Sequence, residues 1–436
     1  MTWSYPLLGE IATSPRHSVR PESGARYELW SVPSYSTGAP ELVEGQEIGS
    51  SKLLVSPQDV LLCKINPRIN RVWVVAQAGE RIQIASPEWI PLRVDRARVD
   101  PKYLAHYLSS PPFRTWIVSA TSGVTGSHAR AKPTEVLRQR VPLASLHEQQ
   151  RVVNILEDHL SRLDVAEDNL QRASRRAASW KSASAFARLL GADSSNVASL
   201  RTAVTDDYSL PTLGDRDWAR LGDLAEVVGG VTKDAKRDDP SMVDVPYLRV
   251  ANVQRMALDL STISTIRVPP AKAESLRLLP GDVLLNEGGD RDKLARGWVW
   301  QGQVENCIHQ NHVYRARPNR EQVLPEWLAW SANYLGGEWA ARHGRQSVNL
   351  ASISLSTIKR MPVPLPSTAR QAELLGELAA VQEGAERVQR QVDAARTRSA
   401  SFRRALLSAA FSGQLTGRAS DSDRIEELAD ASHDPR

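Results

Sequence analysis

The chain has 436 residues, of which 41% are hydrophobic and 24% charged, and its formal net charge is +5. This composition is typical of soluble globular proteins and predicts roughly two to four domains. No apolar run approaches the ~20 residues of a membrane-spanning helix, and the first residues lack the basic and apolar regions of a signal peptide. The two cysteines, Cys63 and Cys307, lie far apart. They exclude a disulfide framework or a cysteine-based zinc site and favour a cytoplasmic protein.

Residues 1–144 predict a mixed α/β domain. Short strand-like runs such as RVWVVAQ and IQIA alternate with turns rich in Gly, Pro and Asp.

Residues 145–191 predict a long helix. Apolar residues recur at alternating spacings of four and three, interrupted only at His159 and Ser184. Such a seam of period 3.5 predicts packing against another helix along its length. Ser145 followed by Glu148 predicts a capping box at the helix start. The seam residues that we single out are Val152, Leu156, Leu163, Leu170 and Trp180.

The remaining chain repeats this plan. A polar, irregular stretch at 192–216 predicts a linker, and 217–366 predicts a second mixed α/β domain. The segment PQDVLL at 57–62 returns as PGDVLL at 280–285, an offset of 223. RVPL at 140 returns as PVPL at 362, an offset of 222. A nearly constant offset indicates an internal duplication.

Residues 367–413 predict the second long helix, with Thr368 and Gln371 as its capping box and Gly413 at its C-cap. Its seam holds over five heptads, with ten of eleven positions apolar. Each helix needs a partner for its stripe, and we expect the two to pack side by side, with an antiparallel arrangement favoured. The seam residues that we single out are Leu374, Leu378, Val381, Val388, Val392, Phe402 and Leu406.

Three apolar residues near the end of this helix, Leu407, Ala410 and Phe411, lie off the seam. We expect them to face the globular domain of the other half or a docked partner. Residues 414–436 hold six acidic residues against three arginines and predict an acidic, disordered tail.

A search for catalytic motifs favours a binding protein. The chain has no G-x-x-x-x-G-K-[ST] phosphate loop. NPRI at 66–69 lacks the second proline and the aromatic residue with which adenine methyltransferases hold a flipped base. HQNH at 309–312 offers two histidines, with only His343 nearby, so a polar recognition segment is favoured over a metal site.

Two similar but diverged modules suit a long target with two different half-sites, such as double-stranded DNA. Basic and amide residues on turns are the candidates for contacting phosphates and base edges. In the first module they are Lys64, Asn66, Arg68, Asn70, Arg71, Ser127, His128, Arg130 and Lys132. In the second they are Arg291, Lys293, Arg296, His309, Gln310, Asn311, His312, Arg342, Arg345, Gln346 and Asn349.

The order of these features resembles the specificity subunit of Type I restriction-modification systems. The resemblance covers nearly the whole chain and includes PGDVLL, VPL leading into EQQRVV, PVPLP leading into RQAELL, and the terminal ALLSAAFSGQL. The first helix ends in ASAFARLLGAD, which keeps Ala185 and Phe186 but lacks the Ser-Gly.

The resemblance implies an α+β fold of two target-recognition domains joined by two long antiparallel helices. It also implies that this subunit performs no catalysis and binds no cofactor. Modification subunits would dock on the helices and methylate adenine with S-adenosylmethionine, and restriction subunits would add translocation and cleavage driven by ATP with Mg.

Two alternatives remain open at this point. The chain could be a non-catalytic coiled-coil scaffold whose globular domains bind protein rather than DNA. It could also be a single-chain modification enzyme, but the missing cofactor loop disfavours that hypothesis.

Overall fold

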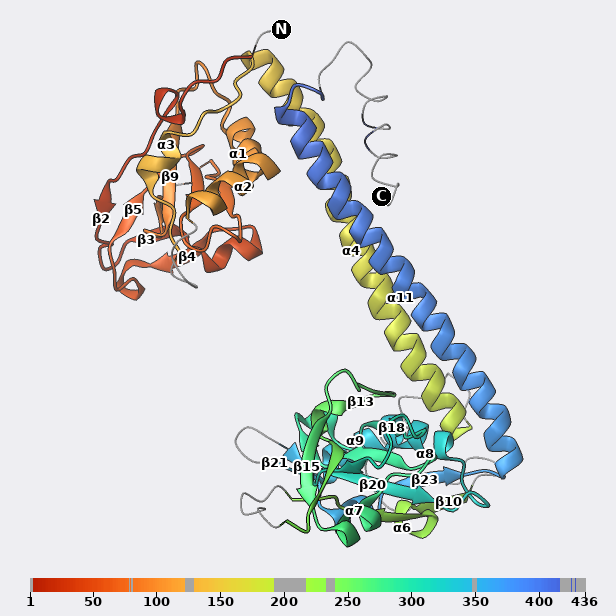
Figure 1. Ribbon diagram of the computed structural model, residues 1–436. Coiled ribbons are helices and arrows are strands. Elements are labelled where there is room, and N and C mark those ends of the chain that lie inside the picture. The colour runs from red at the N-terminus through yellow and green to blue at the C-terminus, as the bar shows by residue number, and fades with distance from the viewer. Residues whose placement is uncertain are drawn as a thin grey trace. The chain divides into compact units, whose positions relative to one another are not determined.

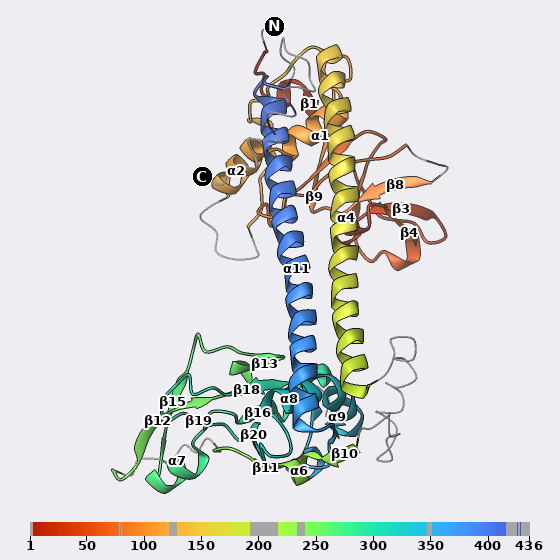
Figure 2. The same cartoon turned by 90° about the vertical axis from the view of Figure 1, so that its right-hand side faces the viewer.

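The computed structural model describes residues 3–77, 79, 81–121, 129–191, 217–232, 240–346, 351–415, 425 and 428. The predicted linker at 192–216 lies outside these residues. The chain forms two units (Figures 1 and 2). Unit 1 comprises Met1–Arg172 and Val392–Arg436, and unit 2 comprises Ala173–Gln391.

Unit 1 contains two sheets. The first is antiparallel, with β1 (Ala12–Thr13), β9 (Trp89–Val94), β6 (Val60–Cys63) and β7 (Val72–Val74) in that order. The second is mixed, with β2 (Ser18–Val19), β5 (Lys52–Leu54), β8 (Ile82–Ala85), β3 (Arg26–Trp30) and β4 (Glu41–Glu44) in that order. The helices of the domain are α1 (Pro101–Ser109), α2 (Pro111–Ala120) and α3 (Pro133–Leu137), with short 3-10 turns η1 (Leu8–Glu10), η2 (Pro33–Thr37) and η3 (Gly45–Glu47).

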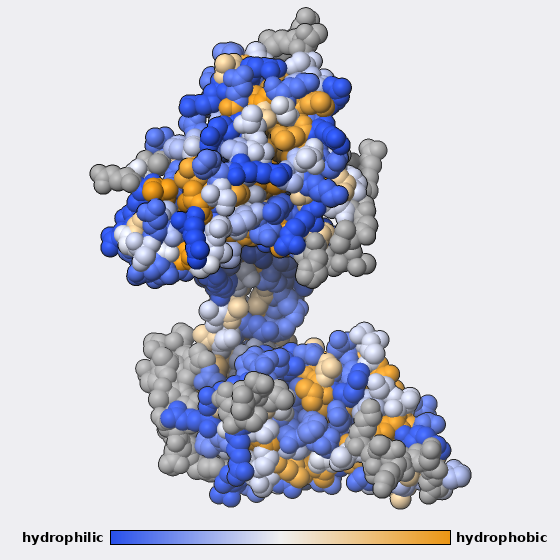
Figure 3. Space-filling view, turned by 90° about the vertical axis from the view of Figure 1, so that its left-hand side faces the viewer, coloured by the Kyte–Doolittle hydropathy of each residue, from blue (hydrophilic) through white to orange (hydrophobic). Residues whose placement is uncertain are grey.

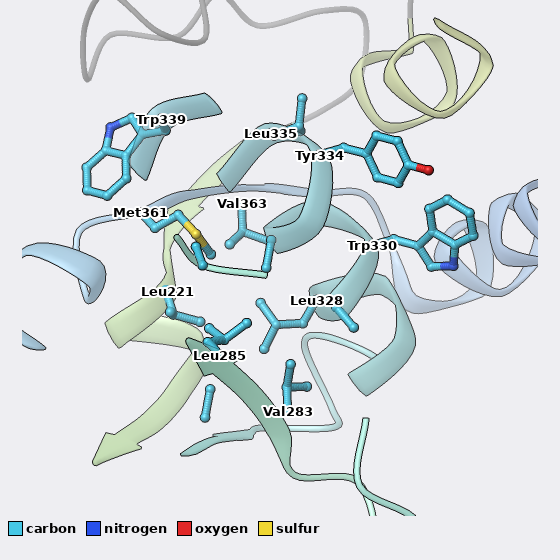
Figure 4. Packing of buried hydrophobic residues seen from close by; sticks show 14 of the residues in the cluster. Leu221, Val283, Leu285, Leu328, Trp330, Tyr334, Leu335, Trp339, Met361 and Val363 are labelled. Carbon is cyan, nitrogen blue, oxygen red and sulfur yellow. The ribbon is translucent and has the colours of Figure 1, made fainter. Parts of the chain in front are cut away.

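Unit 2 contains the equivalent antiparallel sheet, ordered β11 (Ala225–Val228), β20 (Val313–Pro318), β16 (Val283–Asn286) and β18 (Gly297–Val299). Its other sheets are β10 (Asp217–Arg220) with β23 (Pro362–Leu365), β15 (Ser264–Val268) with β12 (Val243–Leu248) and β19 (Ile308–His309), β13 (Val253–Gln254) with β14 (Ala257–Leu258), and β17 (Gly288–Gly289) with β22 (Ala351–Ser352) and β21 (Arg345–Gln346). Its helices and turns are α6 (Leu221–Leu224), η5 (Val250–Asn252), α7 (Pro270–Leu276), η6 (Arg291–Lys293), α8 (Pro325–Ser331), the π-helical η7 (Ala332–Gly336), α9 (Gly337–His343) and α10 (Leu355–Ile358). Figure 4 shows the core of this unit, where Val283 and Leu285 of β16 pack near Leu328 of α8.

The duplication predicted from the sequence is confirmed by the two four-stranded sheets, which have the same strand order. In each, the DVLL motif forms the third strand, and its aspartate is buried in front of that strand. Asp59 accepts from Arg93 Nε at 2.8 Å, and Asp282 accepts from Arg317 Nε at 2.7 Å. A buried carboxylate needs such a partner, which explains why the motif keeps its aspartate in both copies.

The long helices are α4 (Leu146–Leu190) and α11 (Thr368–Phe411). Ser145 Oγ accepts a hydrogen bond from Glu148 N at 3.3 Å, as the capping prediction requires. In the second helix Ser367 Oγ accepts from Arg370 N at 3.4 Å, so the predicted Thr368 cap is wrong by one residue. The cap lies 222 residues after Ser145, which is the offset of the duplication.

Gln371 is no capping residue, because its side chain ties α11 to the domain. Its carboxamide oxygen accepts from Leu324 N at 2.8 Å, and its nitrogen donates to the carbonyls of Gln322 and Pro366. Gln149 makes the matching bonds in unit 1, accepting from Asp100 N at 2.9 Å. These two buried glutamines attach each long helix to the domain that precedes it in the chain.

We expect Gln371→Leu to lower the free energy of unfolding of unit 2 by about 3 kcal/mol, because three backbone groups would lose their partner. Urea unfolding followed by hydrogen exchange of unit 2 would measure this change. The control is Gln391→Leu, at an exposed position of the same helix. Equal effects of the two substitutions would contradict the role assigned to Gln371.

The helices α4 and α11 lie side by side in both views (Figures 1 and 2) and are antiparallel within each unit. In unit 1, Arg396 Nε donates to Glu167 at 2.9 Å and Arg403 pairs with Asp164. In unit 2, Ser174 Oγ donates to Gln389 at 2.7 Å, and Arg188 pairs with Glu377 at 3.1 Å. Among the described residues, no helix combines the length and apolar character needed to cross a bilayer.

Most seam residues turn away from solvent, but two do not. Trp180 is 50% exposed and Val388 is 37% exposed, more than their predicted place in the seam would leave in solvent. The Trp180 ring nevertheless lies over Gly384 of the facing helix. The buried seam residues are Val152, Leu156, Leu374, Leu378, Val381, Val392 and Leu406, and the partly buried ones are Leu163, Leu170 and Phe402.

Each long helix ends inside a domain core. Phe411 packs edge-on against Tyr103 and Tyr107 of α1, with ring centroids 5.1 and 5.4 Å apart. Leu407 and Ala410 belong to the same core, so the expectation that this off-seam face contacts the first domain is confirmed. The end of α4 likewise lies in the core of unit 2, where the ring centroids of Phe186 and Tyr334 are 6.1 Å apart.

A glycine follows each of these helix ends. Gly191 and Gly413 have φ of 72° and 74°, a conformation that favours glycine and reverses the chain after a helix.

The acidic tail is described only at Ile425 and Leu428. Both are helical and partly buried, and both pack against the core of unit 1. The spacing of three places their apolar side chains on one helical face.

Candidate nucleic-acid interface

In unit 1, the candidate residues from Lys64 to Arg71 form the turn between β6 and β7. Asn66 adopts a positive φ of 49°, which asparagine tolerates better than most residues, and its carbonyl accepts from Ile69 N at 2.9 Å. Arg68 at the tip is exposed. The Asn70 side chain has a structural role, since its amide nitrogen donates to the Leu108 carbonyl at 2.8 Å.

A second basic segment lies beside this turn. Asn66 N donates to the Ala129 carbonyl at 3.0 Å, and Ala131 N donates to the Lys64 carbonyl at 2.8 Å. These bonds bring Arg130 and Lys132, both exposed, next to the turn. We name Lys64, Arg68, Arg71, Arg130 and Lys132 together the unit 1 basic surface.

Sequence reasoning missed the acidic partner of this surface. Arg130 donates to the Glu88 carboxylate from Nε at 3.2 Å and from Nη2 at 3.1 Å, and this pairing raises the pKa of Arg130. No local pattern links positions 88 and 130, because their proximity depends on long-range strand pairing.

In unit 2, the equivalent turn lies between β16 and β18. Arg291 Nε donates to the Ala341 carbonyl at 2.7 Å, and Lys293 pairs with Asp290. The sheet of β17, β22 and β21 places the exposed Arg345 beside this turn. Arg342 is also exposed, on α9. We name Arg291, Lys293, Arg342 and Arg345 the unit 2 basic surface.

Arg296 is only partly accessible. Burial, together with the nearby charge of Arg255, lowers its pKa, and its Nε is buried without a hydrogen-bond partner among the described residues. It therefore lies beneath this surface rather than on it.

The HQNH segment divides between core and surface. His309 is fully buried and its Nδ1 lies 2.6 Å from the Val313 carbonyl. Burial lowers its pKa to about 4, so the ring is neutral at pH 7. The prediction that His309 contacts DNA is wrong, because β19 lies within the domain. His312 is exposed and binds Glu287 at 2.7 Å, while Gln310 and Asn311 are partly buried.

Four of the predicted site residues cannot be placed. Ser127, His128 and Asn349 lie outside the described residues, as does the side chain of Gln346.

No metal or redox site emerges from the described residues. They contain no group of three His, Cys, Asp or Glu side chains that could hold a metal ion. Both cysteines are buried, and burial raises the pKa of the Cys63 thiol and raises that of Cys307 to about 12. On the face drawn in Figure 3, hydrophilic side chains cover most of each unit, with smaller hydrophobic patches between them.

Comparison with known proteins agrees with this architecture. No family model matches the chain. The Type I restriction enzyme StySPI specificity subunit of Salmonella potsdam is 24% identical over 333 residues, covering 75% of this chain and 68% of that protein.

Two solved structures share the fold over 95% of this chain. One, described as the structural basis of complex assembly and conformational transition of the type I R-M system, has a TM-score of 0.72 at 19% identity and is covered to 98%. The other, the HsdS subunit from Thermoanaerobacter tengcongensis, has a TM-score of 0.53 at 20% identity and is covered to 97%.

Two repeated α/β domains with paired antiparallel helices are thus the fold that the chain shares with these two structures. In sequence and in fold, the chain is similar to specificity subunits of Type I restriction-modification systems.

Proposed function

We propose that the chain recognises a bipartite, asymmetric site in double-stranded DNA, with one half-site contacted by each unit. The observation that carries this proposal is that both units present a basic surface at the same place in their fold. In each, it is built on the turn after the DVLL strand. The bond from Ala131 N to the Lys64 carbonyl recurs as the bond from Ile353 N to the Glu287 carbonyl, at 2.9 Å.

Equivalent positions of the two turns differ in chemistry. Lys64 corresponds to Glu287, and Arg130 corresponds to Ser352, as the matched backbone bonds show. Because donors and acceptors on base edges are matched by the chemistry of the protein side chain, modules with different side chains favour different half-sites. The exposed arginines and lysines supply the phosphate contacts that position the duplex.

We extend the proposal to partners and cofactors. The exposed faces of α4 and α11 would bind modification subunits, which would carry S-adenosylmethionine, and restriction subunits would carry ATP and Mg. This chain would bind none of these cofactors, and the complex would act in the cytoplasm.

Exchanging residues 217–366 for those of a diverged relative tests the proposal. The chain would be co-expressed with its genomic neighbours, and adenine methylation would be mapped across the genome. We expect methylation of a two-part motif that depends on the presence of this chain. After the exchange, only one half of that motif should change. A change in both halves, or methylation independent of the chain, would contradict the assignment of one half-site to each unit.

A further inference from the structure

Four aromatic side chains of unit 1 form a cluster that the basic surface does not include. Trp30, Tyr35, Trp73 and Trp89 contact one another edge to face or tilted. The ring centroids of Trp30 and Trp73 are 4.5 Å apart, and those of Tyr35 and Trp73 are 5.6 Å apart. We call these four residues the aromatic cluster.

The aromatic cluster adjoins the unit 1 basic surface. Trp73 lies on β7, which begins directly after Arg71, and Trp89 follows Glu88, the partner of Arg130. Ile65, within the basic turn itself, packs against the same hydrophobic group as Trp73. Trp73, on the edge strand β7, therefore lies close to the turn that carries the basic surface.

The cluster has a buried half and an accessible half. Trp30 and Trp89 are 2% and 1% exposed, and Trp89 Nε1 donates to the Trp30 carbonyl at 2.8 Å. Tyr35 and Trp73 are only partly buried. Within the part of the chain that the structure describes, neither the Tyr35 hydroxyl nor Trp73 Nε1 has a hydrogen-bond partner.

Both accessible rings are held in place before any ligand arrives. Tyr35 lies on η2, where Ser34 N donates to Ser31 Oγ at 3.0 Å and Ser31 Oγ donates to Glu41. Trp73 lies between Trp30 and Tyr35 on the edge strand of the sheet. A pre-positioned aromatic side chain loses little conformational entropy on binding.

We infer that Tyr35 and Trp73 contact base edges in the half-site bound by unit 1, an inference that rests on the proposed function. An indole N–H can only donate, so Trp73 would select a base edge that presents an acceptor in the groove. The Tyr35 hydroxyl can donate or accept, and the ring faces can pack against a thymine methyl group or a sugar.

Unit 2 has a different arrangement at this position. Trp298 of β18 is equivalent to Trp73, because it lies opposite Leu284 in the sheet as Trp73 lies opposite Leu61. Trp298, however, packs against the main core of its unit. The aromatic contact is therefore a property of unit 1, and its loss affects one half-site.

The test measures binding of duplex oligonucleotides by the co-expressed complex. The duplexes would carry the mapped motif, with each base pair replaced in turn. Trp73→Phe keeps a ring and removes the N–H, while Tyr35→Phe removes only the hydroxyl. We expect discrimination at one base pair of the unit 1 half-site to fall about five- to tenfold, as for one lost hydrogen bond. Binding of the other half-site and the melting temperature should be unchanged.

Tyr5→Phe is the matched control, since Tyr5 is exposed in the same unit and lies outside the aromatic cluster. Unchanged discrimination in both cluster variants, with a wild-type complex that binds a bipartite site, would overturn this inference alone. A uniform loss over all positions with a lower melting temperature would also overturn it, because the residues would then be structural. A wild-type complex that prefers no duplex sequence and binds protein instead would overturn the proposed function as well.

Discussion

Replacing Leu378 with aspartate is expected to lower the free energy of unfolding of unit 2 by several kcal/mol. Leu378 is 0% exposed and belongs to the core that also contains Phe186 and Leu189 of α4. An unpaired carboxylate placed there is desolvated without compensation, and the leucine contacts are lost as well. Hydrogen exchange of the amides of unit 2 during urea unfolding would report the change.

Val388→Asp is the matched control on the same helix, because Val388 is 37% exposed and a carboxylate there stays hydrated. We expect it to change stability by less than about 1 kcal/mol, as is usual for surface substitutions. Equal destabilisation by the two variants would contradict the packing described for the helix pair.

Replacing Phe411 with alanine is expected to destabilise unit 1 by about 3–5 kcal/mol, the usual cost of removing a buried phenylalanine. The ring is 7% exposed and contacts both Tyr103 and Tyr107, so its loss opens a cavity between α11 and α1. Because two units need not unfold together, protection of amides should be measured separately in each, and unit 2 should keep its protection.

Phe402→Ala provides the comparison. Phe402 is partly exposed and its ring centroid lies 6.3 Å from that of His159, so we expect less than half the effect of Phe411→Ala. Loss of protection in unit 2 as in unit 1, or no loss in either, would contradict the role of the helix end as part of the first domain core.

The helices could be predicted from the sequence because their signals are local. A seam of period 3.5 and a hydroxyl cap depend on residues close together in the chain. The prediction of the N-cap of α11 failed because Ser367 and Thr368 are adjacent and both have a hydroxyl group that could cap the helix. The seam pattern also overestimated the burial of Trp180, since the pattern records that the residue is apolar but not how much of its ring stays exposed.

The candidate site was only partly predictable, because it depends on strand pairing between distant residues. The turn at Lys64 and the segment at Arg130 were both proposed from their composition, but nothing local indicates that they adjoin. His309 shows the opposite error, since a polar HQNH segment gives no sign that its first histidine is buried. The aromatic cluster was missed altogether, because Trp30, Tyr35, Trp73 and Trp89 come from separate segments.

The placement of the helix ends has a consequence for the order in which the protein forms during synthesis. Unit 2 is one continuous segment, Ala173–Gln391, and can complete its core as soon as that segment has left the ribosome. Unit 1 needs Leu406 and Phe411 for its core, and its second segment begins at Val392, only after the 219 residues of unit 2. At about 5–20 residues per second, that stretch takes roughly 10–45 seconds to translate. The domain that is made first is therefore finished last, and it waits with Tyr103 and Tyr107 uncovered until the final helix arrives.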